Sequence, residues 1–200
     1  IIEAANISGG LRVRPKAFAG LPEALVPTDA DAAYDIQDAV HDWFSGHGFG
    51  PRIGYKIGCT TPVMQRYMGI DHPCVGGIFE ARLNHSSAEI DCASLNRPGA
   101  ECEIAVEIGE ALDARETTID QVRAAEAITA LYPAIEVVDD RYRDIMGIGT
   151  PTLIADDFCQ SAAVLGPRNT DWRGLDLGKL TGRTMVNGTE AGAGIGADVL

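Results

Sequence analysis

Basic residues are scarce in this chain of 200 residues, which has 16 Lys and Arg against 29 Asp and Glu. Its formal net charge of −13 would repel the phosphate backbone of nucleic acids and the surface of anionic membranes. The sequence also lacks an apolar run close to the roughly 20 residues that cross a bilayer, and its first residues lack the pattern of a secretory signal. We therefore expect a cytoplasmic protein with no nucleic-acid partner and no membrane partner.

Metal-ligand spacing is missing from both the cysteines and the histidines. The five cysteines are an odd number, and no two of them have the C-x-x-C spacing of zinc or redox sites. We expect reduced thiols, as is usual for a cytosolic protein. The cysteines are Cys59, Cys74, Cys92, Cys102 and Cys159. The histidines, to which we assign no role, are His41, His47, His72 and His85.

Composition and patterning predict one core and a mixed, strand-dominated α/β fold. A hydrophobic content of 46% with 22% charged residues is the balance of a globular domain. The clearest helix spans 28–48, where apolar residues recur at helical spacing and either Thr28 or Asp29 can cap the N-terminus. Several short strands outnumber the two clear helices, which indicates one sheet-based core.

Shorter elements follow from capping and alternation. Thr61-Pro62 predicts the start of a short helix that ends at Gly69. A capping box at 118–121 predicts a second clear helix, whose apolar stripe continues to Leu131. Asn187-Gly188 predicts a tight hairpin turn. The expected strands cover 53–58, 75–79, 101–108, 134–138, 161–165 and 183–186.

Two glutamates alternate with apolar residues along the predicted strand 101–108. Glu101 and Glu103 point to one side, while Cys102 and its apolar partners point to the other, which we expect to face the core. Two carboxylates at this spacing can converge on one cation. The alternative interpretation is a solvent-exposed strand face that carries two hydrated glutamates.

Two further charged residues interrupt apolar strands. Glu136 would be a costly lone carboxylate unless it were metal-bound or paired, for which Arg141 or Arg143 is the alternative partner. Burial of Lys56 would suit it to proton transfer, whereas a nearby carboxylate would hold it charged as a substrate anchor. The alternative for Lys56 is an edge lysine whose ammonium reaches solvent.

Three carboxylates without a His or Cys cluster favour a hard cation that keeps positions open for water and substrate. The sequence therefore predicts one divalent ion, Mg²⁺ or Mn²⁺, bound by Glu101, Glu103 and Glu136. Zinc fits this donor set poorly. Such an ion would also allow an acidic protein to hold an acidic substrate.

Four segments together resemble the 2-keto-4-pentenoate hydratase branch of the fumarylacetoacetate hydrolase superfamily, which also includes 2-oxo-hepta-enedioate hydratases and 4-oxalocrotonate decarboxylases. The order and spacing of the segments make the resemblance more specific than any one motif. It runs from about Asp29 to the last residue, Leu200. The segments are GYKIGCTTP at 54–62, GIDHP at 69–73, ECE at 101–103 and PAIEVV at 133–138.

The resemblance implies a β-roll of the fumarylacetoacetate hydrolase C-terminal-domain type with flanking helices. It implies that Lys56 is the catalytic lysine and that the three glutamates bind the metal. The implied reaction is hydration of a 2-hydroxy-2,4-dienoate, from the meta-cleavage degradation of aromatic compounds, to a 4-hydroxy-2-oxo acid. The substrate's carboxylate and 2-oxygen would chelate the metal. A homo-oligomer is also implied.

The same resemblance suggests how the chain is organised. We expect residues 1–52 to be an N-terminal helical segment packed on the core. Residues 53–200 would then form the metal-binding mixed β-roll that carries the catalytic site. Members of the family normally continue well beyond the last residue of this chain, so we expect a C-terminal truncation.

Two departures from the family pattern leave the reaction open. Cys74 stands where hydratases of this branch usually carry an Asp that is thought to take part in proton transfer. A decarboxylase of 2-oxo-enedioates and a non-catalytic partner subunit are therefore the alternatives. Glu80 is a candidate catalytic carboxylate that could compensate, unless it is a surface residue. Asp157 stands where relatives often have Asn, and its charge would repel a substrate anion unless it were protonated or turned away.

Overall fold

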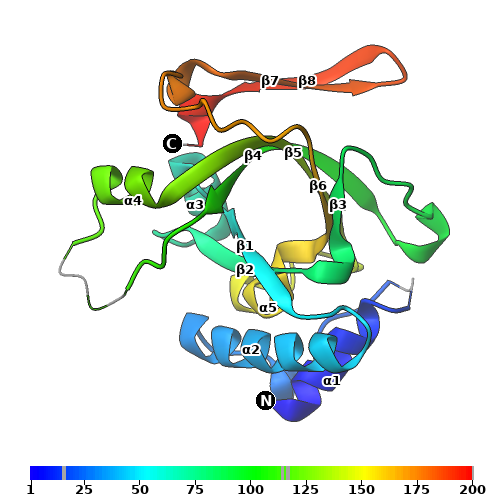
Figure 1. Cartoon of the computed structure of the whole chain (residues 1–200). Coiled ribbons are helices and arrows are strands. Elements are labelled where there is room, and N and C mark those ends of the chain that lie inside the picture. Colours follow the sequence, from blue (N-terminus) through cyan, green and yellow to red (C-terminus); the bar gives the residue numbers. More distant parts are fainter. Residues whose placement is uncertain (15–16, 114, 116–117, 200) are drawn as a thin grey trace.

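The computed structural model describes residues 1–14, 17–113, 115 and 118–199. Helices α1 and α2 lie at one end, the curved strands occupy the middle, and the β7–β8 hairpin lies at the opposite end (Figure 1). The helices are α1 (Ile2–Leu11), α2 (Ala30–Gly46), α3 (Pro62–Met68), α4 (Gln121–Ala127) and α5 (Thr150–Ala155). The strands are β1 (Arg52–Gly58), β2 (Cys74–Phe79), β3 (Leu83–His85), β4 (Pro98–Ile108), β5 (Ile128–Asp139), β6 (Gln160–Leu165), β7 (Thr181–Val186) and β8 (Thr189–Ile195).

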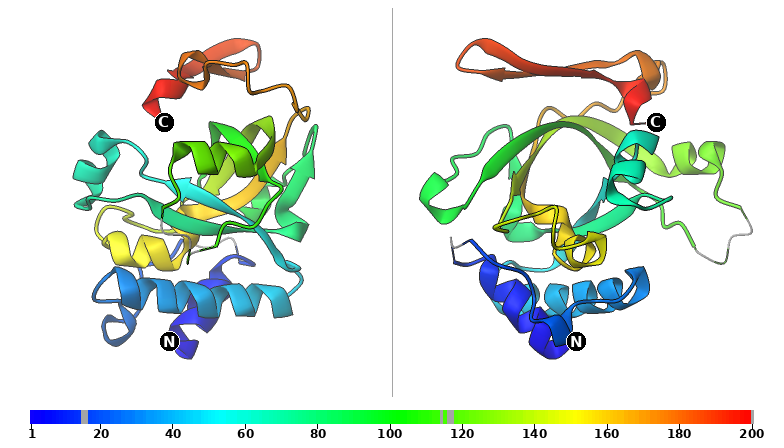
Figure 2. Two further views of the ribbon diagram at one scale, coloured as in Figure 1. Left: turned by 60° about the vertical axis from the view of Figure 1, so that its left-hand side comes forward. Right: turned by 180° about the vertical axis from the view of Figure 1, so that it is seen from behind.

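The strands form a four-stranded sheet and two hairpin-like pairs. The sheet has the order β3-β6-β5-β4, in which β5 pairs antiparallel with both β4 and β6 while β3 pairs parallel with β6. The long strands β4 and β5 curve over the antiparallel β1–β2 pair, so that the strands enclose a common interior (Figure 2). The predicted mixed α/β roll with flanking helices is confirmed.

Across the described ranges, no helix is both long and apolar enough to cross a bilayer.

The α2 helix forms where its capping and its apolar stripe predicted it. The Asp29 side chain accepts a hydrogen bond from the backbone N–H of Ala32 at 2.9 Å, which satisfies one unpaired donor of the first turn. Its buried stripe, which includes Val40 and Phe44, packs on α1, α5 and β2. This layer forms the main hydrophobic core and fixes the position of the β1–β2 pair above it.

Two short predictions are also confirmed. Thr61 caps α3 by accepting from the Met64 N–H at 3.2 Å, and Gly69 ends the helix in the left-handed conformation with φ 68°. Asn187 and Gly188 join β7 to β8 with φ values of 52° and 83°, the pair of positive angles that a tight hairpin turn needs.

The predicted helix from the capping box at 118–121 was wrong at both ends. The observed cap is Asp120, which accepts from the Arg123 N–H at 2.9 Å, and α4 stops at Ala127. Leu131 lies in β5 opposite Val106, because pairing with β4 along nearly the whole strand outweighs the local helical periodicity. Pro133 is tolerated in β5 because β6 pairs only from Ala134 onward, so its missing N–H costs no bond to β6.

The α1 helix was missed because its sequence is a poor helix former, with glycines at positions 9 and 10. Packing explains the first of them. A Cβ on Gly9 would come 2.5 Å from the ring of Trp43, so this glycine allows α1 to press against α2. The short elements α5 and β3 were also missed, since each is too brief to show periodicity.

The expectation that Cys102 faces the core was wrong. Cys102 is exposed, and so are Val106 at 49% and Ile108 at 50%, which lie on the same face of β4. Glu136 is registered opposite Glu101, and its side chain reaches Lys56 of β1. Alternation along β4 was predicted correctly, but the assignment of its faces was reversed. The curved sheet turns its carboxylate face inward, where Lys56 of β1 contacts it.

A close approach at Gly77 yields a test of the packing between α2 and β2. A Cβ there would lie 2.8 Å from Nε2 of His41, which is buried and hydrogen-bonded on both ring nitrogens. Gly77→Ala should therefore lower the free energy of unfolding by about 1–3 kcal/mol, measured by urea denaturation.

The matched control is Gly54→Ala on β1, where a Cβ would meet, among the described residues, only Ile78 at 3.8 Å. This change should stay within about 0.5 kcal/mol of the parent. Equal destabilisation by the two substitutions would contradict the account of Gly77.

Candidate functional site

Three carboxylates meet on the inner face of β4 and β5. Glu101 lies directly opposite Glu136 in the strand register, and Glu103 lies two residues further along β4. Each residue offers one carboxylate oxygen, and these oxygens lie within 4.8 Å of one another. Glu136 is buried, Glu103 is partly buried and Glu101 is exposed, so the cluster is open on one side. The structure thus brings together the three glutamates that the sequence singled out.

Lys56 reaches this cluster from β1. Its Nζ lies 3.2 Å from Oε1 of Glu136, and each of the two side chains is 11% exposed. A solvent-reaching edge lysine is therefore wrong for Lys56. The alternative pairing of Glu136 with Arg141 is wrong as well, because Arg141 pairs with Asp156 at 3.0 Å.

The cluster has more negative charge than Lys56 can neutralise. Burial raises the pKa of Glu136, and the positive charge of Lys56 only partly opposes this. Burial also raises the pKa of Glu103, with a further rise from the neighbouring charges of Glu136 and Glu101. Glu136 Oε1 is shut off from solvent and, within the described ranges, has no hydrogen-bond partner despite its ion pair with Lys56. These properties suit a site that takes up a proton or a cation.

Two thiols lie near Lys56, and neither is activated. Cys59 follows β1, and Cys74 is registered opposite Gly58 at the start of β2. Burial raises the pKa of Cys74 to about 11 and, to a lesser extent, that of Cys59, while Lys56 opposes both rises. Both groups are therefore neutral thiols at neutral pH, which argues against a nucleophilic cysteine. All five cysteines of the chain are free.

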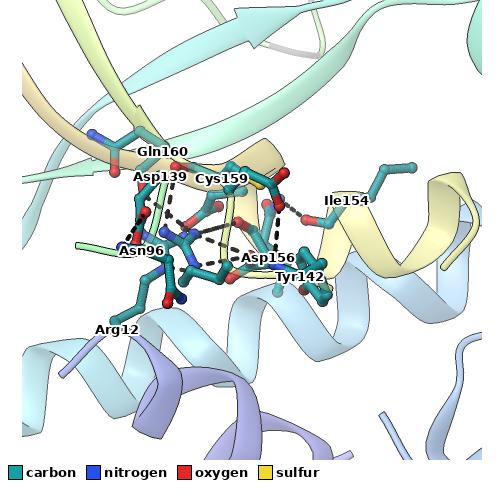
Figure 3. A network of polar contacts seen from close by, with 12 residues as sticks. Arg12, Asn96, Asp139, Tyr142, Ile154, Asp156, Cys159 and Gln160 are labelled. Carbon is teal, nitrogen blue, oxygen red and sulfur yellow. Dashed lines mark hydrogen bonds and ion pairs between the residues drawn. The ribbon is translucent and has the colours of Figure 1, made fainter. Parts of the chain in front are cut away.

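A buried network of charges joins the end of α1 to residues 156–160. Arg12, just beyond α1, donates to Asp156 at 3.2 Å and also bonds the backbone carbonyl of Gln160 at the start of β6 (Figure 3). Arg141 pairs with the other carboxylate oxygen of Asp156. Opposite charges are thus matched within a region that water does not reach, as buried ions require.

Asp157 is turned away from the site and held inside the same network. Its carboxylate accepts from the Gly77 N–H at 3.0 Å and pairs with His41 at 2.8 Å and with Arg12 at 3.2 Å. Burial alone would raise the pKa of Asp157, but the bond from His41 and the charge of Arg12 outweigh it and leave that pKa lowered. The expected repulsion of a substrate anion is therefore avoided by the orientation of the side chain.

Glu80 is not brought to the carboxylate cluster. It lies exposed just after β2, with its carboxylate beside Gly50, while Lys56 is registered opposite Gly76 further along the strand pair. This location agrees with the surface carboxylate that we gave as the alternative. A catalytic role for Glu80 stays a prediction that depends on the resemblance alone.

Sequence reasoning missed three residues around the site. Arg12 and His41 come from the N-terminal helices, and Phe158 places its ring centroid 5.8 Å from Nζ of Lys56. The departure at Asp156-Asp157 was the one signal that could have led to them, because two adjacent carboxylates inside an apolar stretch require cationic partners.

A mixed β-roll whose inner face carries a glutamate cluster and a lysine is what the resemblance to the fumarylacetoacetate hydrolase superfamily implied. The 4-oxalocrotonate decarboxylase from Pseudomonas putida G7, solved with magnesium and adipate, has a similar fold with a TM-score of 0.90. The match covers 99% of this chain and 74% of that one. At 22% sequence identity, this likeness shows the fold alone.

Sequence relatives identify the branch. The 2-keto-4-pentenoate hydratase of Paraburkholderia xenovorans is 30% identical over 186 residues, which cover 92% of this chain and 67% of the relative. That of Paraburkholderia phymatum is 35% identical over 160 residues, covering 80% of this chain and 60% of the relative. A 4-oxalocrotonate decarboxylase of a Pseudomonas species is 31% identical over 144 residues, covering 70% of this chain and 55% of that enzyme.

The chain belongs to the 2-keto-4-pentenoate hydratase branch of this superfamily. It spans about 60% of the length of the hydratases from Paraburkholderia phymatum and Burkholderia vietnamiensis. No protein-family model matches the chain.

The lowered pKa of Asp157 predicts how acid affects the buried network. A carboxyl whose pKa falls on folding stabilises the protein above its ordinary value, here 3.8, and loses that contribution as the pH drops through the lower folded-state value. Asp157→Asn should lower the free energy of unfolding by about 2–4 kcal/mol at neutral pH. Below pH 3.8 the difference from the parent should shrink.

Urea denaturation across this pH range checks the prediction. Asp42→Asn is the control, because Asp42 is exposed on α2 beside His41. A difference between parent and Asp157→Asn that is constant with pH would show that the charge of Asp157 is not what stabilises the buried network.

Proposed function

We propose that this chain forms the centre of a divalent-metal-dependent hydro-lyase that adds water to a 2-hydroxy-2,4-dienoate and yields a 4-hydroxy-2-oxo acid. The reaction would belong to the meta-cleavage degradation of aromatic compounds. The proposal rests above all on the contact of Lys56 Nζ with Glu136 at 3.2 Å inside a three-carboxylate cluster. Relatives named 2-keto-4-pentenoate hydratase, at 30–35% identity, support the substrate class.

Glu101, Glu103 and Glu136 would hold the cation, and their oxygen donors suit Mg²⁺ or Mn²⁺. The raised pKa values of Glu136 and Glu103, which the Lys56 ammonium 3.2 Å from Glu136 does not offset, support this assignment. Solved structures of a similar decarboxylase contain magnesium in one case and calcium in the other, which supports a hard divalent ion. When bound, the ion would supply positive charge that polarises the 2-oxygen of the substrate.

The chain's own residues would perform the proton transfer. Lys56 would hold a proton at Nζ and exchange it with a carbon of a substrate that enters from the open side of the cluster, beside Glu101. Glu136 would keep Nζ in place through their ion pair. The low exposure of both side chains would keep bulk water away from the proton path.

Decarboxylation of a 2-oxo-enedioate is the second candidate, and the state of Cys74 favours it. Cys74 is 1% exposed, and burial raises the pKa of its thiol to about 11, so the thiol cannot replace an ionised carboxylate as a proton acceptor at neutral pH. A reaction that releases CO₂ needs no base to activate water. The named decarboxylase among the sequence relatives supports this alternative.

The remaining assignments rest on the resemblance. We infer a homo-oligomer in the cytoplasm whose ligand is a small 2-oxo or 2-hydroxy-dienoic acid. We also propose the division into a helical segment, residues 1–52, and a catalytic roll, residues 53–200. If the chain is a non-catalytic partner subunit instead, it will bind ligand but turn over only when an active hydratase or decarboxylase chain is added.

Turnover assays test the proposal. The parent, supplied with Mg²⁺ or Mn²⁺, should consume 2-hydroxypenta-2,4-dienoate and form the 4-hydroxy-2-oxo acid, and EDTA should abolish this. Lys56→Gln should lower kcat on the order of 10²–10⁴-fold, the usual contribution of a positioned acid–base group. Lys179→Gln, which alters an exposed lysine, is the matched control and should retain activity.

Three results would change the assignment. Release of CO₂ from 4-oxalocrotonate without hydration of the dienoate would replace the hydratase by a decarboxylase. Full activity of Lys56→Gln would remove the lysine from the mechanism. Absence of turnover with both substrates, alone and with a partner chain, would contradict the enzyme assignment.

A further inference from the structure

We propose that Phe158 is a positioning residue for Lys56, whose ammonium it holds against Glu136. The proposal rests on the proposed function, in which Lys56 transfers a proton, and it names the side chain that orients this lysine. The ring is carried by a left-handed turn, residues 157–159, that is anchored outside the carboxylate cluster.

Two groups contact the Lys56 ammonium. The Phe158 ring centroid lies 5.8 Å from Nζ, within the roughly 6 Å over which an aromatic face attracts a cation. Oε1 of the Glu136 carboxylate lies 3.2 Å from Nζ. Lys56 therefore has little freedom to leave Glu136 while the ring is in place.

The backbone that carries the ring is strained. Asp157, Phe158 and Cys159 have φ values of 52°, 48° and 64°, three consecutive residues in the region that favours glycine. A bulky aromatic residue is unusual in this conformation. Such strain persists only where the surroundings dictate it, and it gathers at functional sites. The turn thus holds Phe158 in an orientation that the chain would not adopt by itself.

The surroundings that impose the turn come from three separate elements. Arg12 follows α1, His41 belongs to α2 and the Gly77 N–H belongs to β2, and all three bind the fully buried Asp157 carboxylate. Gly76 is needed too, because a Cβ there would lie 3.1 Å from Cβ of Asp157. The N-terminal helices therefore reach Lys56 indirectly, through Asp157 and then Phe158.

Phe158 also packs against the main hydrophobic core and against a smaller cluster of Tyr142, Leu153 and Cys159, so a purely structural role is the competing explanation. Two readouts separate the roles. One is the split between kcat and KM for the substrate that the parent turns over. The other needs no turnover and measures, at one fixed pH, how fast an amine-acetylating reagent labels Lys56, with the 82% exposed Lys179 as internal reference. Peptide mass spectrometry reports both labelling rates in the same sample.

The variants are Phe158→Ala, Phe158→Leu and Phe158→Tyr. Leu keeps most of the apolar volume without a π face, which provides a folded variant if Ala destabilises the turn, and Tyr restores the ring. Tyr55→Leu is the matched control, since Tyr55 stacks on Arg52 at 4.7 Å and lies exposed on the same strand as Lys56.

We expect Ala and Leu to speed labelling of Lys56 several-fold relative to Lys179. They should lower kcat by about 10-fold or more, because misplacing a reacting group by 1 Å can cost about 10²-fold. KM should change little, since the proposed role of Lys56 is to transfer a proton and the metal-binding glutamates would hold the substrate's chelating oxygens through the ion. Tyr should restore both values, and Tyr55→Leu should change neither.

Unchanged Lys56 labelling in folded Phe158→Leu would overturn the positioning role, whatever the parent turns over. A lower kcat together with a higher KM in all three Phe158 variants, Tyr included, would assign Phe158 to the core instead. If the parent turns over nothing while Lys56 labelling still responds to the ring, the proposed function fails and the positioning role stands.

Discussion

A buried carboxylate must be neutralised, and the rest of this site depends on how Glu136 meets that requirement. Glu136 is 8% exposed and shares its surroundings with two more glutamates. Lys56 supplies one positive charge at 3.2 Å, yet the pKa values of Glu136 and Glu103 remain raised, because burial and mutual repulsion outweigh that charge. The cluster is therefore deficient in positive charge, and that deficiency is the physical basis for a divalent ion.

The fold serves this site by bringing two faces together. Strands β4 and β5 turn their carboxylate faces inward and leave apolar side chains such as Val106 on the outside. The β1–β2 pair brings Lys56 to the same interior, and the α1–α2 layer fixes that pair through a shared core. Arg12 and His41 bind Asp157, and the positive charge of Arg12 offsets this carboxylate, which is turned away from the glutamate cluster.

The sequence predicted local structure well at two helix N-termini and one hairpin turn. Asp29, Thr61 and the Asn187-Gly188 pair act through hydrogen bonds or backbone angles that depend on few neighbours. The helix expected to reach Leu131 failed because pairing between β4 and β5 decides that segment, and such long-range pairing cannot be seen in a local pattern. Helix α1 was missed for the same reason, since its packing against Trp43 outweighs its glycines.

The candidate site was predictable where charged residues interrupt or alternate with apolar residues in a strand. Charged residues in apolar strands identified Lys56 and Glu136, and alternation placed Glu101 and Glu103 on one face. Which face points inward depends on the curvature of the whole sheet, so Cys102 was assigned to the wrong side. The supporting residues Arg12, His41 and Phe158 are far apart in sequence, and only the folded chain brings them to Asp157 and Lys56.

The measurement that tests the central claim most directly is thermal unfolding with Mn²⁺ and oxalate, an analogue of a chelating 2-oxo acid. Ligands that bind the native state must raise the melting temperature. The account predicts a rise that needs both components, occurs in the parent and in Glu126→Gln, whose glutamate is exposed on α4, and is lost in Glu136→Gln. The same rise in Glu136→Gln, or none in the parent, would contradict the claim that the inward glutamates form a metal centre.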